Sequence, residues 1–330
     1  MKKLINDVQN IVTECCEGAV CVRPNKLKKL ASHDVVVSKT FNKNNVAIIS
    51  GGGSGHEPAH AGYVGDGMLA AAVAGPIFTS PTPAMIQAAI KECDSQNGTL
   101  LIIKNYTGDV MNFKLIAQMT RAQGKKIDYV IVADDVALLG NQSTTGMRGI
   151  AGTVLVHKVA GAKAQSGASL EEVKAAAGKA IKNVGTYGIS LESCTVPAIG
   201  HKSFTLADNE VEMGLGIHGE PGVKRVKMQK VDVFVEEMTN AIINHLQLKG
   251  NDNVAVLING LGSTPIMELY IVNRKVHEML KKMNINVAVN FVGNYMTAID
   301  MIGMSISLMK LDDELEALLN APCDTLALKV

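Results

Sequence analysis

Short apolar runs alternate with helical patterns along most of the chain, and this alternation limits the possible folds more than any other feature of the sequence. Runs that fit buried strands lie at 46–50, 99–104, 128–133, 253–258, 285–291 and 305–309. Patterns typical of helices lie at about 82–93, 110–122, 150–163, 170–184, 231–246, 265–283 and 312–320. Strands that alternate with helices predict an α/β fold, in which helices flank a largely parallel or mixed sheet.

Two domains are expected, because 330 residues is long for a chain with a single hydrophobic core. A segment rich in glycine and proline at 196–230 interrupts the alternation. The sequence from Asn45, NVAIISGGGSG, resembles the sequence from Asn253, NVAVLINGLGSTP. This similarity indicates either two related halves or a strand–turn pattern that unrelated segments share. We predict an N-terminal α/β domain at 1–184 and a C-terminal α/β domain at 185–330.

Composition argues against two classes of partner. The formal net charge is +1, whereas a surface for nucleic acid or membrane requires concentrated basic residues. No apolar run reaches the length of about 18 residues that a membrane span needs, and the first residues lack the apolar core of a signal peptide. The six cysteines show no C-x-x-C spacing. We therefore expect a reduced, cytoplasmic protein with no nucleic-acid partner and no membrane association.

The segment GGGSGHEP at 51–58 matches parts of several site motifs, but each match fails at one position. No lysine follows Gly55, as a phosphate-binding P-loop requires, and Pro58 replaces the third glycine of a dinucleotide-binding motif. A serine elbow needs glycine at the position of His56. His56 and His60 form the pattern H-E-x-x-H of zinc proteases, but Pro58 between them disfavours the required helix. We expect no metal ligands in this segment.

Two predicted loops, at 51–56 and 105–109, each follow a predicted strand. Glycine lets backbone N–H groups approach a small oxygen-rich ligand closely. In parallel α/β sheets, ligands bind beyond the carboxyl ends of the strands. His56 and Asp109 are therefore expected at the same edge of one sheet, although this argument leaves the ligand open.

Five segments make the interpretation more specific. They are GGGSGHEP (51–58), IFTSPTP (77–83), IIKNYTGDVMNF (102–113), SFTLADNE (203–210) and GLGIHGEPG (214–222). Together, and in this order, they resemble the DhaK family, the substrate-binding subunits of dihydroxyacetone kinases. The resemblance extends through essentially the whole chain, to NGLGSTP (259–265) and the last strands.

The resemblance implies that His218 forms a covalent hemiaminal with the carbonyl carbon of a short ketose, dihydroxyacetone. A neutral imidazole nitrogen is nucleophilic, and an unperturbed pKa of about 6.5 leaves most imidazole neutral at cellular pH. Capture at a carbonyl also separates a ketone from a polyol, because glycerol offers no carbonyl to attack. Without the resemblance, His218 would be read as a surface histidine between glycines.

The resemblance assigns catalytic roles to two further residues. Asp109 accepts the proton of the hydroxyl that is phosphorylated, or aligns that hydroxyl, and His56 hydrogen-bonds the substrate and acts as acid or base. Substrate hydroxyls are also bound by Gly53, Ser54, Gly55 and Lys104. The structural alternatives are a helix N-cap for Asp109, a satisfied loop histidine for His56 and a solvated strand-end cation for Lys104. His60 has no assigned role and is interpreted as structural.

The resemblance also implies partners, because phosphoryl transfer needs a nucleotide and Mg²⁺, and this chain shows no recognisable site for either. It implies no cofactor in this chain and places ADP or ATP and Mg²⁺ on an all-helical domain that is fused downstream or is a separate subunit, DhaL. The chain ends at Val330 without such a domain, so we expect the separate type. In that type, the phosphotransferase-system protein DhaM recharges ADP on DhaL from phosphoenolpyruvate. A homodimer is expected.

Two alternatives stay open. DhaK-like paralogues act as ligand-sensing coactivators, which bind the ketose and then a transcription regulator without catalysis. The presence of His56 and Asp109 in addition to His218 favours the kinase, because a sensor needs capture but no activation of a hydroxyl. The substrate can also be another short ketose, such as a tetrulose, since nothing in the sequence measures the length of the pocket.

Overall fold

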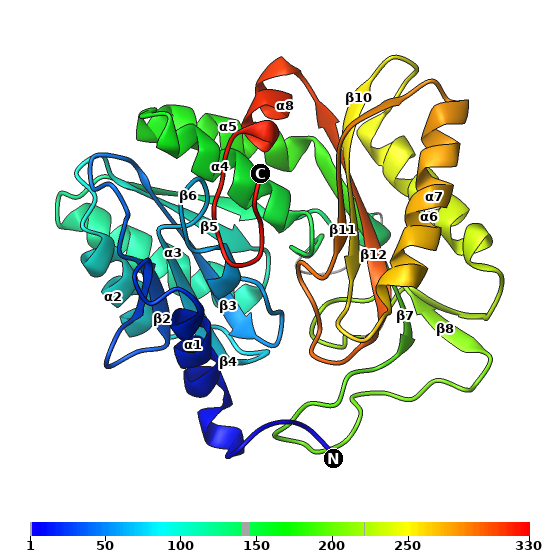
Figure 1. The fold of residues 1–330 in the computed structure, drawn as a ribbon, viewed down its shortest axis with the longest axis horizontal. Helices are drawn as coiled ribbons and strands as arrows, with labels where there is room; N and C mark the ends of the chain where they lie inside the picture. The colour runs from blue at the N-terminus through cyan, green and yellow to red at the C-terminus, as the bar shows by residue number, and fades with distance from the viewer. Residues whose placement is uncertain (1, 140–145, 221) are drawn as a thin grey trace. The chain divides into compact units, whose positions relative to one another are not determined.

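A computed structural model describes residues 2–139, 146–220 and 222–330. The chain divides into two compact units, which Figure 1 shows as ribbons. The N-unit contains Lys2–Val132, Val154–Ala180 and Leu318–Val330, and the C-unit contains Ala133–Thr153 and Ile181–Ala317. Segments of the two units therefore interleave along the chain. The domain boundary that we place between residues 184 and 185 stays a prediction.

The N-unit is built on a six-stranded sheet with the order β1-β2-β4-β3-β5-β6. From edge to edge, its strands are β1 (Leu27–Lys29), β2 (Val35–Ser38), β4 (Ala71–Ile77), β3 (Ala47–Ser54), β5 (Thr99–Lys104) and β6 (Ile127–Val132). β3 is parallel to β4 and β5, and β5 is parallel to β6, whereas β2 is antiparallel to both β1 and β4. β3 and β5 therefore end at the same edge of the sheet.

Both faces of this sheet are buried. The helices of the N-unit are α1 (Ile11–Val22), α2 (Pro83–Cys93), α3 (Thr107–Ala122), α4 (Thr153–Gln165) and α5 (Leu170–Lys182), with 3₁₀ turns at Val8–Asn10 and Ala61–Tyr63. Ile86 of α2 and Phe113 of α3 pack on one face, which includes Leu101 of β5. Its neighbours Leu100 and Ile102 point to the opposite face and are equally buried. This explains why the strand reads as a continuous apolar run.

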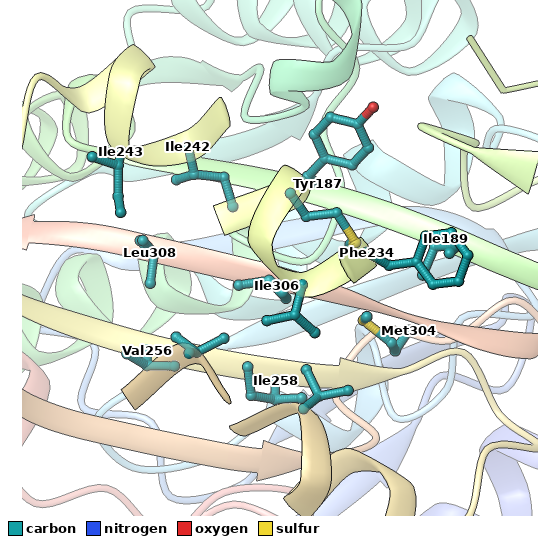
Figure 2. Packing of buried hydrophobic residues seen from close by; sticks show 14 of the residues in the cluster. Tyr187, Ile189, Phe234, Ile242, Ile243, Val256, Ile258, Met304, Ile306 and Leu308 are labelled. Atoms are coloured by element: carbon teal, nitrogen blue, oxygen red, sulfur yellow. The ribbon is translucent and has the colours of Figure 1, made fainter. Parts of the chain in front are cut away.

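The C-unit has a second six-stranded sheet, with the order β11-β10-β12-β7-β8-β9. Its strands are β11 (Asn286–Gly293), β10 (Asn253–Gly260), β12 (Ile302–Leu311), β7 (Val184–Glu192), β8 (Glu210–Met213) and β9 (Lys224–Lys227). Its helices are α6 (Val231–Leu246), α7 (Ile266–Lys282) and α8 (Asp313–Asn320), with a 3₁₀ turn at Val136–Leu138. Figure 2 shows the core of this unit, where Phe234 and Ile242 of α6 face Val256 of β10 and Ile306 of β12.

The α/β class and the mixed character of both sheets confirm the predicted fold, but the C-unit sheet is less parallel than the sequence suggested. β10 and β11, which α7 connects, are parallel. β12 is antiparallel to β10 and β7, and β7, β8 and β9 are antiparallel in turn. No helix separates β7 from β8, β8 from β9 or β11 from β12 among the described residues. Without a helical crossover, the chain returns in the antiparallel direction.

Every strand and helix that the alternation predicts is present, with ends shifted by at most four residues. The prediction missed β1, β2, β4, β7, β8 and β9. In the described parts of the chain, no helix combines the length and the apolar character that crossing a membrane requires.

Ile306→Ala is expected to lower the free energy of unfolding by about 2–5 kcal/mol, because a buried cavity replaces the lost carbon atoms. Ile306 is completely buried in β12, between β10 and β7. Urea unfolding followed by circular dichroism measures the change. Ile199→Ala is the matched control, since Ile199 is 55% exposed, and its expected effect is below about 0.5 kcal/mol. Equal losses in both variants would contradict this description of the core.

Candidate functional site

The glycine run at 51–53 lies inside β3, so the predicted loop at 51–56 is wrong for these residues. The chain leaves the strand only after Ser54. A Cβ atom on Gly51 would lie 2.4 Å from the carbonyl oxygen of Val73, and one on Gly53 would lie 2.6 Å from the backbone nitrogen of Thr79. No real side chain fits at such distances. Glycine is needed here because neighbouring backbone packs against the strand, not because the segment is a flexible loop.

Gly52 lies where two charged side chains meet. Lys104 is the last residue of β5, and Asp109 lies in the first turn of α3. A Cβ atom on Gly52 would lie 3.2 Å from Lys104 Nζ and 3.3 Å from Asp109 Oδ2, so both groups reach the same point above this glycine. Lys104 is completely buried and Asp109 is 2% exposed. An ammonium group and a carboxylate at one buried point offer a substrate hydroxyl both a donor and an acceptor.

His56 and Asp109 follow the ends of β3 and β5, which are parallel neighbours. The two residues therefore lie at the sheet edge where the sequence places them. Two of the structural alternatives are wrong. Lys104 is buried and not solvated, and Asp109 lies inside α3, whose N-cap is Tyr106. A carboxylate in the first turn of a helix interacts favourably with the N-terminal end of the helix dipole.

Three predicted site residues lie at the end of β3. The Ser54 hydroxyl donates a hydrogen bond to a carbonyl oxygen of β4 at 2.7 Å, so it can offer a ligand only acceptor lone pairs. The Gly55 N–H donates to both oxygens of the Glu57 carboxylate, at 3.0 and 3.2 Å. His56 is completely buried, and its ring stacks on Phe78 with a centroid distance of 5.2 Å. Gly53 is the fourth predicted residue, and the β3–β4 ladder shifts register directly after it.

A pair of buried histidines lies next to this region. The rings of His60 and His157 are 5.2 Å apart, and Tyr63 meets the His157 ring edge-on. Neither ring nitrogen of His157 has a hydrogen-bond partner among the described residues. Burial, together with the positive charge of Lys104, lowers the pKa of His157 to about 3 and holds the pKa of His60 well below its usual range. Both rings are therefore neutral near neutral pH.

His218 lies in the C-unit, in the loop between β8 and β9. Gly214 begins the loop and donates its N–H to the carbonyl oxygen of Gly188 in β7 at 2.7 Å. Glu220 closes the loop: its Oε2 accepts the backbone N–H of His218 at 2.9 Å, and its Oε1 lies 3.1 Å from the Nδ1 atom of the His218 ring. Pro221 of this motif lies outside the described residues.

The Glu220 carboxylate favours one of the two tautomers of the His218 ring. Burial by itself raises the pKa of Glu220, but the hydrogen bond and charge of His218 and the charge of Arg148 outweigh it and hold the pKa at about 2. Glu220 is therefore ionised near neutral pH. A carboxylate beside Nδ1 favours the tautomer of the neutral ring with hydrogen on that atom, and Nε2 then carries the lone pair.

Sequence reasoning missed Glu220 and His157. Nothing in the sequence distinguishes His157 from any other helical residue, because its contact with His60 depends on packing. Glu220 had a detectable signal, since a Glu-Pro pair follows a glycine-rich segment at both 57–58 and 220–221. In both places, the Glu carboxylate accepts the N–H of the residue two positions earlier.

The zinc-protease pattern lacks the helix that it requires. His56 and His60 are joined by turns and not by a helix, so they do not share a helix face. Across the described residues, no three His, Cys, Asp or Glu side chains are grouped in a way that could hold a metal ion.

The fold and these side chains define the class as an α/β protein that places buried polar groups at the ends of sheet strands. The model of the Dak1 domain matches residues 17–327, and the chain belongs to this family. It is 46% identical to the PTS-dependent dihydroxyacetone kinase 1, dihydroxyacetone-binding subunit DhaK, of Listeria innocua, over 99% of this chain and 100% of the relative.

Two solved structures are similar over nearly the whole chain. The dihydroxyacetone kinase of C. freundii in complex with AMP-PNP and Mg²⁺ is 36% identical with a TM-score of 0.91, and the match covers 99% of this chain and 60% of that enzyme. The dihydroxyacetone kinase operon co-activator DhaQ is 38% identical with a TM-score of 0.90, and the match covers 98% of both chains. The family thus includes both a kinase and a co-activator.

His157→Gln is expected to reduce the loss of stability in acid. The folded state keeps a pKa of about 3 at His157, whereas an unfolded histidine has a pKa of about 6.5. Between these values only the unfolded state binds the proton, so the free energy of unfolding falls as the pH decreases. The variant should lower this slope by ~1.4 kcal/mol per pH unit, the contribution of one proton.

Urea unfolding at several pH values between 6 and 4 measures the slope. His201→Gln is the control, because His201 is exposed to water in both states and should leave the slope at the wild-type value. A wild-type slope for His157→Gln would show that His157 takes up its proton in the folded state.

Proposed function

We propose that this chain is the dihydroxyacetone-binding subunit of a phosphoenolpyruvate-dependent dihydroxyacetone kinase. The observation that carries the proposal is the contact between His218 Nδ1 and Glu220 Oε1 at 3.1 Å. A histidine held in this way presents its Nε2 lone pair for attack on a carbonyl carbon. Membership of the Dak1 family and the name of the Listeria innocua relative support a ketose as the ligand.

Capture of the ketose is a reversible addition. Nε2 of His218 forms a bond to the carbonyl carbon, and the electron pair of the C=O bond moves to its oxygen. The ring becomes positively charged during this step, and the ionised Glu220 beside Nδ1 stabilises that charge. Transfer of the Nδ1 hydrogen to the new alkoxide completes a neutral hemiaminal. The product has the same atoms as the free ketose and histidine.

Activation of the substrate hydroxyl falls to the N-unit residues. Asp109 aligns the hydroxyl that is phosphorylated and accepts its proton, and Lys104 binds a substrate oxygen. Their shared position above Gly52 supports these roles. His56 hydrogen-bonds the substrate as an acid or base, with Gly53, Ser54 and Gly55 as neighbouring contacts. Burial of these groups excludes water, which strengthens each polar interaction.

The nucleotide and Mg²⁺ are proposed to lie on a separate DhaL subunit, which DhaM recharges with a phosphoryl group from phosphoenolpyruvate. One observation supports a partner of this kind. The C. freundii enzyme was solved with AMP-PNP and Mg²⁺, and the match to this chain covers 60% of it. We propose a cytoplasmic homodimer as the form of the subunit that meets DhaL.

The similarity to DhaQ keeps a ligand-sensing coactivator as the second candidate function. Such a protein requires capture at His218 but no phosphorylation. Phosphorylation of dihydroxyacetone in a mixture with DhaL, DhaM and the general phosphotransferase proteins separates the two candidates. A tetrulose, tested in the same mixture, decides whether a longer ketose is the better substrate.

His218→Ala is expected to abolish covalent capture, because no nucleophilic nitrogen remains. Intact-protein mass spectrometry after incubation with dihydroxyacetone should show an adduct on the wild-type chain and none on the variant. His201→Ala, which removes an exposed histidine of the same unit, should keep the adduct. An undiminished adduct on His218→Ala would remove His218 from the proposed mechanism.

Asp109→Asn is expected to keep the adduct and to lower turnover at least ~100-fold, because the amide cannot accept the hydroxyl proton. The rate of dihydroxyacetone phosphate formation with DhaL, DhaM and phosphoenolpyruvate measures the effect. Adduct formation by the same sample provides the control for folding. Turnover at the wild-type rate would exclude Asp109 as the proton acceptor.

A further inference from the structure

We propose that Arg148, fixed by Asp135, is a positioning residue for His218. It binds the backbone of the 214–220 loop and places its positive charge near the Glu220 carboxylate, so that the ring keeps its hydrogen on Nδ1 and its lone pair on Nε2. The inference deepens the proposed function and rests on it for the role of His218. All of these residues belong to the C-unit.

The Arg148 guanidinium binds both the buried Asp135 and the loop. Its Nε donates to Asp135 Oδ2 at 2.7 Å, and its Nη2 lies 2.6 Å from the same oxygen. Nη2 also donates to the carbonyl oxygen of Gly214 at 2.7 Å. Asp135 is completely buried and Arg148 is 8% exposed. The side chain is therefore fixed by an ion pair and is also hydrogen-bonded to the first residue of the His218 loop.

The third nitrogen of Arg148 faces the other end of that loop. A Cβ atom on Gly216 would lie 2.8 Å from Arg148 Nη1 and 2.1 Å from Glu220 Oε2. The guanidinium and the carboxylate thus approach the same face of Gly216, and any larger residue there would separate them from the loop. The positive charge of Arg148 contributes to the low pKa of Glu220.

The segment that carries Arg148 is itself anchored to the sheet. Asp134 accepts the backbone N–H groups of Ile150 and Gly152, at 2.7 and 2.8 Å. Its own carbonyl oxygen accepts the N–H of Thr186 in β7 at 2.7 Å. The Asp135 N–H donates to the carbonyl oxygen of Arg148 at 3.1 Å. Arg148 is therefore held by both its backbone and its side chain against a central strand.

This arrangement makes a line of alternating charge that ends at the reactive ring. Burial raises the pKa of Asp135 to about 6 despite Arg148, so at neutral pH the residue is mostly ionised. Arg148 then lies between two carboxylates, Asp135 and Glu220. Without the charge and the planar guanidinium group of Arg148, the carboxylates of Asp135 and Glu220 would repel each other. Glu220 could then turn toward water. Loss of the Glu220 contact would let the His218 ring adopt either tautomer.

The experiment compares four variants of the full chain by ¹⁵N NMR of labelled histidine. Wild-type His218 is expected to show hydrogen on Nδ1, and Arg148→Lys and Arg148→Met are expected to show mixed tautomers. Glu220→Gln is nearly isosteric and should give hydrogen on Nε2, because its amide can donate to Nδ1. Arg225→Lys is the matched control: it alters a second ion pair of the same hairpin, with Glu212 at 2.7 Å, that does not include Glu220.

The dissociation constant of the dihydroxyacetone adduct gives a second readout. Arg148→Lys should raise it at least tenfold and leave kcat at saturating ketose within about twofold, because phosphoryl transfer follows capture. An unchanged tautomer and affinity in both Arg148 variants would overturn the inference, as would an equal loss in Arg225→Lys. If wild-type forms no adduct but the tautomer changes as expected, the positioning role stands and the proposed function fails.

Discussion

The polar site of the N-unit depends on the burial of Lys104 and Asp109. An ionised group taken out of water costs several kcal/mol unless a partner stabilises its charge. Both side chains approach Gly52, where a Cβ atom would lie only 3.2 to 3.3 Å from them, so glycine leaves them the room that a side chain would crowd. Burial lowers the pKa of the neighbouring His60 and His157, and the ammonium charge adds to this effect, so these histidines stay neutral.

The two glycine-rich segments, at 51–58 and 214–222, share one local hydrogen bond, from a backbone N–H to the Glu side chain two residues later. Glu57 accepts the N–H of Gly55, and Glu220 accepts the N–H of His218. In each case a carboxylate takes up a backbone donor that the strand no longer pairs, and the turn is fixed without a helix cap. At Glu220, the other carboxylate oxygen also lies next to the Nδ1 atom of the His218 ring. There the same turn orients a histidine ring in addition to fixing the backbone.

The sequence predicted the elements that a local pattern of apolar residues marks. It missed the elements and residues whose role depends on contacts with distant parts of the chain. Apolar runs and helical periodicity located the buried strands and the helices, and the parallel order placed His56 and Asp109 at one sheet edge. The glycines at 51–53 were predicted to form a loop because glycine is rare in strands. The backbone that requires Gly51 and Gly53 comes from β4 and from Thr79, far from them in the sequence. β4 (AAVAGPI) contains mostly alanine and glycine in place of β-branched residues, so its propensity for strands is weak. In β7 (VGTYGISLE), glycines interrupt the residues that favour a strand. The role of Glu220 depends on its contact with the His218 ring, which only the structure shows.

The proposed chemistry requires different charge states of the two side chains: neutral for His218 and ionised for Asp109. Attack on a carbonyl needs an uncharged ring with a lone pair, whereas alignment of a hydroxyl needs an ionised carboxylate. Each group has a neighbour of the sign that the proposal requires: Glu220 lies beside the ring of His218, and the Lys104 ammonium approaches the same glycine as the Asp109 carboxylate. A coactivator that only captures a ketose would need the first pair. It would not need a carboxylate to accept the proton of a hydroxyl, so the presence of Asp109 favours a protein that also activates a hydroxyl.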